Sequence, residues 1–276
     1  MLRLLNIELQ KLRHNRAAKV ISIIYFILIT FIALIASIEF NFGDFHFRLA
    51  EQGIFNFPFI WHFNTYIAAI LKLFLAIVIV SMMSNEYSYR TLKQNLIDGL
   101  SKKEFVLSKF LTVLLFSIIS TFFIFVVSLI LGLSFSDYNE LRIIFSDMEY
   151  IGAYFIKLVA FFSFCLFLGV LVKRSAFALG FLFVCFIFEK ILWGILEWRL
   201  LRDEADSIMQ FFPLEAMSNL IREPFTRLGA VQSAANQLGE NFTKDYDVTF
   251  LNLAIVLIWT VLFLYWSYAI LKKRDL

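Results

Sequence analysis

Three ionisable residues stand inside long apolar runs of this sequence: Lys72, Glu189 and Lys190. Lys72 lies nine residues into its run, about 14 Å along a helix that rises ~1.5 Å per residue. A charge near the bilayer centre costs roughly 2.5–3.5 kcal/mol on insertion scales, so it usually faces a cavity, a partner or a transport path. For Lys72 a transport role and a structural ion pair stay equally open. Glu189 and Lys190 lie nearer a helix end, where a snorkelling or helix-end role is favoured over a place on a translocation pathway.

Other chemistry is poorly supported. No Gly-x-x-x-x-Gly-Lys-Ser/Thr phosphate loop occurs, so ATP hydrolysis by that route is excluded for this chain. The three histidines fall outside the predicted spans (His14, His46, His62). The two cysteines, Cys165 and Cys185, lie in apolar runs without the spacing of a zinc site. We therefore predict no catalytic, metal-binding or cofactor-binding residues, and the net charge of +3 without a basic cluster does not suggest nucleic acid.

The apolar runs predict an all-α membrane protein. The chain has 276 residues, of which 61% are hydrophobic and 17% charged, whereas soluble domains have about half and about a quarter. Each run is long enough for a helix to cross the hydrocarbon core, and none alternates as barrel strands do. A single bundle over 1–276 should hold six spans: 20–38, 63–84, 105–133, 150–172, 176–195 and 250–271. Lys109 and Lys157 are expected at interfacial positions near span ends, with no special role.

The distribution of basic residues predicts the orientation of the bundle. Six spans place both termini on one side. That side holds 14 basic residues: Arg3, Lys11, Arg13, Arg16, Lys19, Arg90, Lys93, Lys102, Lys103, Lys173, Arg174, Lys272, Lys273 and Arg274. The other side, although longer, holds 7: Arg48, Arg142, Arg199, Arg202, Arg222, Arg227 and Lys244. By the positive-inside rule, both termini should be cytoplasmic.

Two segments outside the spans are predicted to be helical. Residues 1–19 contain a basic amphipathic stretch, with Leu2, Leu5, Leu9 and Leu12 on one face, which is typical of an interfacial helix. A charged flank that only fixes orientation is the alternative. Before the last span, 209–217 is apolar but too short to cross, so a re-entrant segment and a surface helix broken at Pro213 are both open.

The connection between the second and third spans, 85–104, is the most informative segment. Tyr89, Leu92 and Leu96 follow helical spacing, so a short helix with one apolar face is expected. Gly99 suits the position just after a helix end, and Ser101 with Glu104 has the pattern of a capping box that begins the next helix. We therefore predict a compact, ordered protrusion on the cytoplasmic side.

This pattern resembles the permease subunit of ABC-2 type transporters. The likeness covers nearly the whole chain, and its most specific part is Asn85-Glu-Tyr-Ser-Tyr-Arg-Thr-Leu92 followed by Leu100-Ser-Lys-Lys-Glu-Phe-Val-Leu-Ser-Lys109. The resemblance implies a coupling helix that docks on a cytoplasmic ATPase, with the coupling residues Glu86, Tyr87, Arg90, Thr91, Leu92 and Gly99. Arg90 stands where the family usually has glycine, and the turn at Gly99 lacks the frequent proline.

The resemblance also implies short outer helices before the last span, around 209–220, and a substrate path near the second and fifth spans, which hold Lys72, Glu189 and Lys190. It implies partners and a location as well. The chain would be an exporter subunit of the bacterial inner membrane, paired with a second permease copy or a related subunit. Two ATPase chains would bind the ATP and Mg²⁺. The alternative is an ion- or proton-coupled secondary transporter that titrates Lys72 and Glu189, although we find no internal repeat of the kind such proteins show. A membrane enzyme, the third possibility, lacks catalytic groups.

Overall fold

The computed structural model describes residues 2–37, 39–42, 45–48, 53–138, 140–200, 204–228, 231–233, 237 and 245–274. The first half of the chain forms α1 (Leu2–His14), α2 (Arg16–Ser37), β1 (Glu39–Phe42), β2 (Phe45–Arg48), α3 (Phe59–Ser88), α4 (Thr91–Ile97) and α5 (Lys102–Phe135). The second half forms α6 (Leu141–Ile144), α7 (Glu149–Val172), α8 (Ser175–Ile195), the π-helical turn Leu196–Leu200, α9 (Ala205–Met209), α10 (Pro213–Asn219), the 3₁₀ turn Phe225–Arg227 and α12 (Phe250–Lys273).

The fold is a helical membrane bundle, as the sequence predicts. Within the described residues five helical segments are long and apolar enough to span a membrane. They are α3, α5, the pair α6–α7 counted as one segment, α8 and α12. A sixth candidate is the bent pair of α1 and α2, whose axes meet at 89°. The break falls at Asn15, so α1 lies across the end of α2 rather than continuing it.

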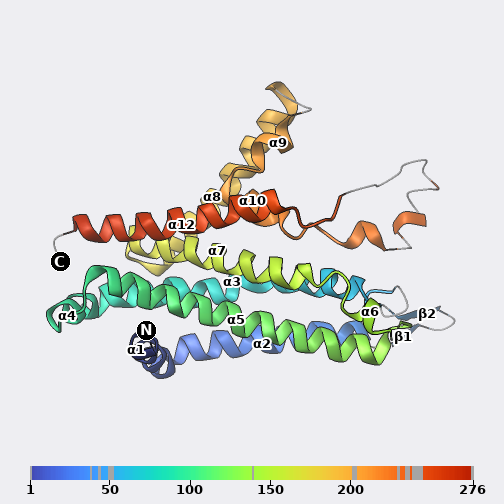
Figure 1. The fold of residues 1–276 in the computed structure, drawn as a ribbon, viewed down its shortest axis with the longest axis horizontal. Coiled ribbons are helices and arrows are strands. Elements are labelled where there is room, and N and C mark those ends of the chain that lie inside the picture. Colours follow the sequence, from blue (N-terminus) through green and yellow to red (C-terminus); the bar gives the residue numbers. More distant parts are fainter. Residues whose placement is uncertain are drawn as a thin grey trace.

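The long helices lie side by side along the bundle (Figure 1). The helix α7 is at the centre, where it packs against α3, α5, α8 and α12, and 72% of its most apolar stretch of 18 residues is buried. The helix α8 is the opposite case, because only 11% of the corresponding stretch is buried. Its far end stands away from the bundle together with α9 (Figure 1). The helix α8 therefore presents most of its apolar surface outward.

The two ends of the bundle differ in structure. The helices α1 and α4 and the end of α12 lie at one end, and α6 and the antiparallel β1–β2 hairpin lie at the other (Figure 1). The helix α3 begins at Phe59, four residues before the predicted span 63–84. His62 therefore lies inside the helix α3.

Small and polar residues allow close contact between helices in the core. A Cβ atom at Gly132 of α5 would overlap the Phe57 ring, so only glycine leaves room for that ring. The hydroxyl groups of Tyr25, Ser120 and Tyr154 bond to one another at 2.5–2.9 Å. Because the three buried hydroxyl groups bond to one another, each has a partner without water. The triad also joins α2, α5 and α7.

Candidate functional site

The junction between α3 and α5 is built by local backbone signals. Arg90 adopts a left-handed conformation, φ 58°, and so breaks the helix between α3 and α4. At the end of α4, Gly99 has φ +96°, and the amide N–H of Leu100 donates to the Asn95 carbonyl at 3.0 Å. This is the Schellman arrangement, which favours glycine. Ser101 and Glu104 then form the predicted capping box of α5. Both predicted turn signals are confirmed.

A buried cluster of four charges lies behind this junction. The Lys109 ammonium contacts Glu8 at 2.6 Å and Glu86 at 2.5 Å. Lys11 contacts Glu86 at 2.7 Å and Glu8 at 3.4 Å. The side chains of Lys109, Glu8 and Glu86 are 1%, 2% and 3% exposed, and that of Lys11 is 32% exposed. Two positive and two negative charges balance, which is the condition under which buried ions are tolerated.

The same cluster holds α4. The other carboxylate oxygen of Glu86 accepts a hydrogen bond from the Thr91 hydroxyl at 2.6 Å and a longer one from the Asn95 amide at 3.4 Å. Burial by itself lowers the pKa of Lys11, but the hydrogen bond to Glu86 and the charges of Glu8 and Glu86 outweigh it, so the pKa is raised above its usual value. Lys11 therefore stays charged. Through Glu86 the cluster joins α1, α3, α4 and α5.

The short helix α4 presents a different surface to solvent. Leu92 is buried in the main hydrophobic core, whereas Tyr89 and Ile97 are 76% and 75% exposed. Arg90 and Lys93 are exposed as well. Tyr89 does not share the predicted apolar face with Leu92, because the left-handed residue Arg90 separates them. The exposed surface therefore combines apolar and basic side chains.

A second contact group ties α3 to α7 and to the end of the chain. The Tyr87 hydroxyl donates to the Val170 carbonyl at 3.4 Å and accepts from the Arg274 guanidinium at 3.0 Å. Arg274 also donates to the Val170 carbonyl at 2.7 Å. Lys173, at the end of α7, lies 5.8 Å from the Tyr87 ring centroid. Glu86 and Tyr87 thus anchor α3 to separate sets of helices.

The lysines inside the bundle have few anionic contacts. The Lys72 ammonium lies 4.6 Å from the Phe161 ring centroid, a cation–π distance. Lys157 is buried and donates to the carbonyl groups of Ser218 and Ile221 at 3.4 and 3.3 Å. In the part of the chain that the structure describes, no carboxylate pairs with either lysine. Lys157 was expected to need no special role, but its side chain is buried and contacts the backbone of α10 and of the residues that follow it.

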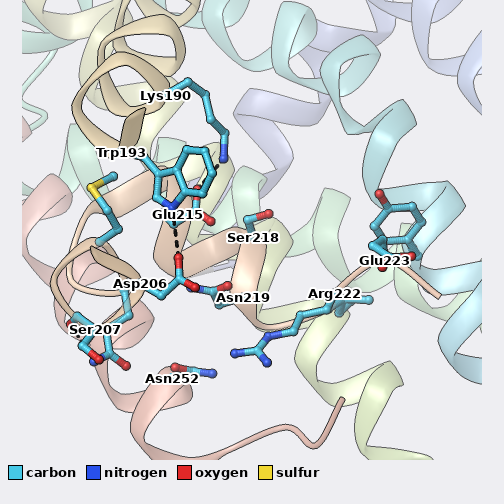
Figure 2. A pocket seen from close by; sticks show the side chains of 14 residues that line it. Lys190, Trp193, Asp206, Ser207, Glu215, Ser218, Asn219, Arg222, Glu223 and Asn252 are labelled. Carbon is cyan, nitrogen blue, oxygen red and sulfur yellow. Dashed lines mark hydrogen bonds and ion pairs between the residues drawn. The ribbon is translucent and has the colours of Figure 1, made fainter. Parts of the chain in front are cut away.

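Glu189 and Lys190 contact α10 rather than Lys72. The Glu189 carboxylate accepts from the backbone N–H groups of Leu214 and Glu215 at 3.1 and 2.8 Å, which caps α10 and places a negative charge at its N-terminus. Lys190 pairs with the Glu215 side chain at 2.7 Å (Figure 2). Among the described residues no contact joins Lys72 to Glu189, so the structure does not bring this proposed titrating pair together.

At the opposite end of α3, His62 is fully buried. Its ring stacks on Tyr150 at a centroid distance of 4.3 Å. Its Nε2 atom lies 2.9 Å from the Arg222 carbonyl, and its Nδ1 atom lies 3.1 Å from the Arg227 guanidinium. Because guanidinium can only donate, Nδ1 is the acceptor and the proton resides on Nε2, which donates to Arg222. The two ends of α3 thus hold different parts of the chain.

A comparison with protein families decides which family the chain belongs to. A family model described as "ABC-2 family transporter protein" matches residues 2–276. The chain belongs to the ABC-2 transporter family. No curated protein sequence matches it. An ABC-2 transporter chain is the membrane subunit of an ABC transporter rather than its ATPase, and this membership implies an ABC ATPase partner.

In this ABC-2 transporter, the predicted coupling residues divide by position. Glu86 and Thr91 meet in the buried cluster, and Leu92 packs into the core. Arg90 and Gly99 form the two turns that bound α4. Of the described residues, no group of three or more His, Cys, Asp and Glu side chains could hold a metal ion.

Sequence reasoning missed three residues of the cluster, Glu8, Lys11 and Lys109. Lys109 was expected to have no special role, which was wrong, because it pairs with Glu8 of α1 and Glu86 of α3. Glu8 carried a signal, since it is the sole acidic residue of 1–19 and interrupts an otherwise basic amphipathic stretch.

Proposed function

We propose that this protein is the permease subunit of an ATP-driven exporter and that α4 docks on a separate cytoplasmic ABC ATPase. It would lie in a bacterial plasma membrane with both termini in the cytoplasm. Two permease copies, or this chain and a related subunit, would bind two ATPase chains that hold ATP and Mg²⁺. The observation that carries the proposal is the junction itself, a short helix with an exposed apolar and basic surface fixed to three longer helices by buried charges.

The arrangement suits the transfer of a mechanical force from α4 to the longer helices. A force applied to α4 passes through Thr91 to Glu86 and then to Lys109 and Glu8 without a flexible linker between them. Charge-assisted hydrogen bonds of this kind are shorter and stronger than neutral ones. Closure of the ATPases would therefore displace α1, α3 and α5 together and shift the bundle between inward-open and outward-open states.

The translocation pathway would include Lys72, Glu189 and Lys190. Lys72 supplies a cation at mid-bundle that lies against an aromatic ring, free to attract a passing anionic group. Glu189 and Lys190 shape the far end of the path through their contacts with α10. These roles rest on the chemistry of the side chains and on their position within membrane helices.

The test places a charge on the exposed surface of α4. Ile97→Asp and Arg90→Glu should leave folding intact, because both side chains face solvent, and should uncouple ATP hydrolysis from transport in vesicles that contain both subunits. Leu141→Asp is the matched control, since Leu141 is equally exposed on α6 at the other end of the bundle. Leu92→Asp should instead unfold the junction. Normal coupling in Ile97→Asp and Arg90→Glu would remove the docking role of α4.

A further inference from the structure

A hollow of about 630 Å³ opens between α8, α9, α10 and the first turn of α12. This volume is within the range of small-molecule sites, roughly 300–1,000 Å³. Its lining includes Lys190, Asp206, Glu215, Asn219, Arg222 and Asn252 (Figure 2). The buried Lys157 lies beneath it, since its ammonium donates to the carbonyl groups of the lining residues Ser218 and Ile221.

Two of the lining charges are not neutralised by neighbours. Lys190 and Glu215 pair with each other, but Asp206 accepts only from the neutral indole N–H of Trp193, at 2.9 Å. Arg222 donates to the backbone carbonyl of Asp245, at 2.7 Å. In the described chain no ion pair involves Asp206 or Arg222. Within the described residues, the second carboxylate oxygen of Asp206 and the other guanidinium N–H groups of Arg222 are therefore open to a ligand in the hollow.

Amide side chains lie between these two charges. Figure 2 shows Asn219 beside Asp206, and the end of Asn252 turned toward the Arg222 guanidinium. Asn252 is 7% exposed, and neither amide group has a side-chain hydrogen bond within the described residues. Both amide groups line the hollow, so they can hydrogen-bond to a molecule that enters it. Because an amide both donates and accepts, it can serve either end of a molecule that carries both charges.

The rim of the hollow continues into apolar surface on α8. The Lys190 ammonium lies 6.0 Å from the ring centroid of Phe186. Phe183 lies about one turn before Phe186 in α8, further from the hollow. Both rings are exposed. An acyl chain attached to a group in the hollow could lie along these rings, since residues three to four positions apart share a helix face.

We propose that this hollow binds the zwitterionic head group of a membrane amphiphile, with its phosphate or carboxylate at Arg222 and its ammonium at Asp206. That the bound amphiphile is the transported substrate rests on the proposed permease function. Binding itself requires neither ATP nor the partner.

The experiment measures displacement of radiolabelled dodecylphosphocholine from the purified full chain in maltoside micelles. The competitors share one alkyl chain: unlabelled dodecylphosphocholine, N-dodecyl betaine, dodecyl phosphate and dodecyltrimethylammonium. The wild type should bind the zwitterions about tenfold more tightly than either single-charge compound, because each lost charge-assisted bond lowers affinity by roughly that factor. The two zwitterions distinguish phosphate from carboxylate.

Variants assign the two ends. Arg222→Gln should weaken the zwitterions and dodecyl phosphate, and Asp206→Asn should weaken the zwitterions while leaving dodecyl phosphate unchanged. Arg142→Gln and Asp98→Asn are the controls, since both residues are exposed elsewhere. Equal binding of all competitors, or variants that match their controls, would overturn the proposal. Glycerophosphocholine that competes as well as dodecylphosphocholine would overturn the assignment of an amphiphile.

The two proposals fail separately. If charge on α4 leaves coupling normal while the zwitterions bind as described, the docking role falls and the head-group site stands. If coupling is lost but no competitor is preferred, the permease role stands and the hollow is not this site.

Discussion

Removal of the Lys109 ammonium should be among the most damaging single changes to the bundle. Lys109→Met keeps an unbranched apolar side chain, one atom shorter, and deletes the group that contacts both Glu8 and Glu86 at 2.6 and 2.5 Å. Two carboxylates, 2% and 3% exposed, would then share only Lys11. Breaking a buried ion pair by removing one partner costs about 3–5 kcal/mol of unfolding free energy, because the remaining charge is left uncompensated.

The cluster supplies its own controls. Lys11 contacts the same carboxylates, but its side chain is 32% exposed and Lys109 still pairs with both of them, so Lys11→Met should cost less unfolding free energy than Lys109→Met. Adding Glu8→Gln to Lys109→Met deletes one charge of each sign and restores the balance. The double variant should therefore be more stable than the sum of the single effects predicts, with a coupling energy of roughly 0.5–3 kcal/mol.

The assay is reversible unfolding of the purified chain in mixed micelles with increasing dodecyl sulfate, followed by far-ultraviolet circular dichroism. The four proteins of the Glu8–Lys109 cycle are measured together with Lys11→Met. If Lys109→Met loses no more stability than Lys11→Met, or if the double variant is simply additive, the cluster does not hold α1, α3 and α5 together.

Three further changes test other features. Gly132→Ala should lower stability by about 1–3 kcal/mol in the same unfolding assay, because its methyl group would overlap the Phe57 ring, whereas Gly152→Ala, with open space around it, should be tolerated; equal effects would contradict the close packing. Lys72→Leu should lower transport in reconstituted vesicles while insertion and ATPase binding stay normal, and unchanged transport would exclude its role in the pathway. A thiol introduced at the exposed Ser88 of an otherwise cysteine-free chain should resist impermeant reagents in intact cells and react in inverted vesicles; labelling from outside would reverse the proposed orientation.

Features that depend on neighbours in the sequence could be predicted. The Ser101–Glu104 capping box and the left-handed Gly99 each involve residues within a few positions, and the structure has both. The helical membrane class likewise follows from long apolar runs. The lengths of the helices were less accessible, because α3 continues past the hydrophobic core to Phe59 at one end and Ser88 at the other, where polar residues interrupt the run.

Contacts between distant segments could not be predicted. Lys109 and Glu8 are 101 positions apart, and hydropathy alone places Lys109 near a helix end, where a lone lysine can reach water. The partners of Lys157 are backbone carbonyl groups, which no side-chain pattern reveals. The position of Tyr89 depends on the left-handed backbone of Arg90. An arginine rarely adopts that conformation, so the sequence did not indicate it.

The uninterrupted helix α3 has a mechanical consequence. Its 30 residues form a rod of about 45 Å at ~1.5 Å per residue, with Glu86 at one end and His62 near the other. His62 is 24 residues from Glu86, about 36 Å along the rod, so a pivot of only about 5° at Glu86 moves His62 sideways by about 3 Å, which is enough to break a hydrogen bond. The contact between His62 and the Arg222 carbonyl at 2.9 Å must then either break or draw the chain around Arg222 with it. A small rotation on one side of the membrane would thus be amplified into a rearrangement on the other.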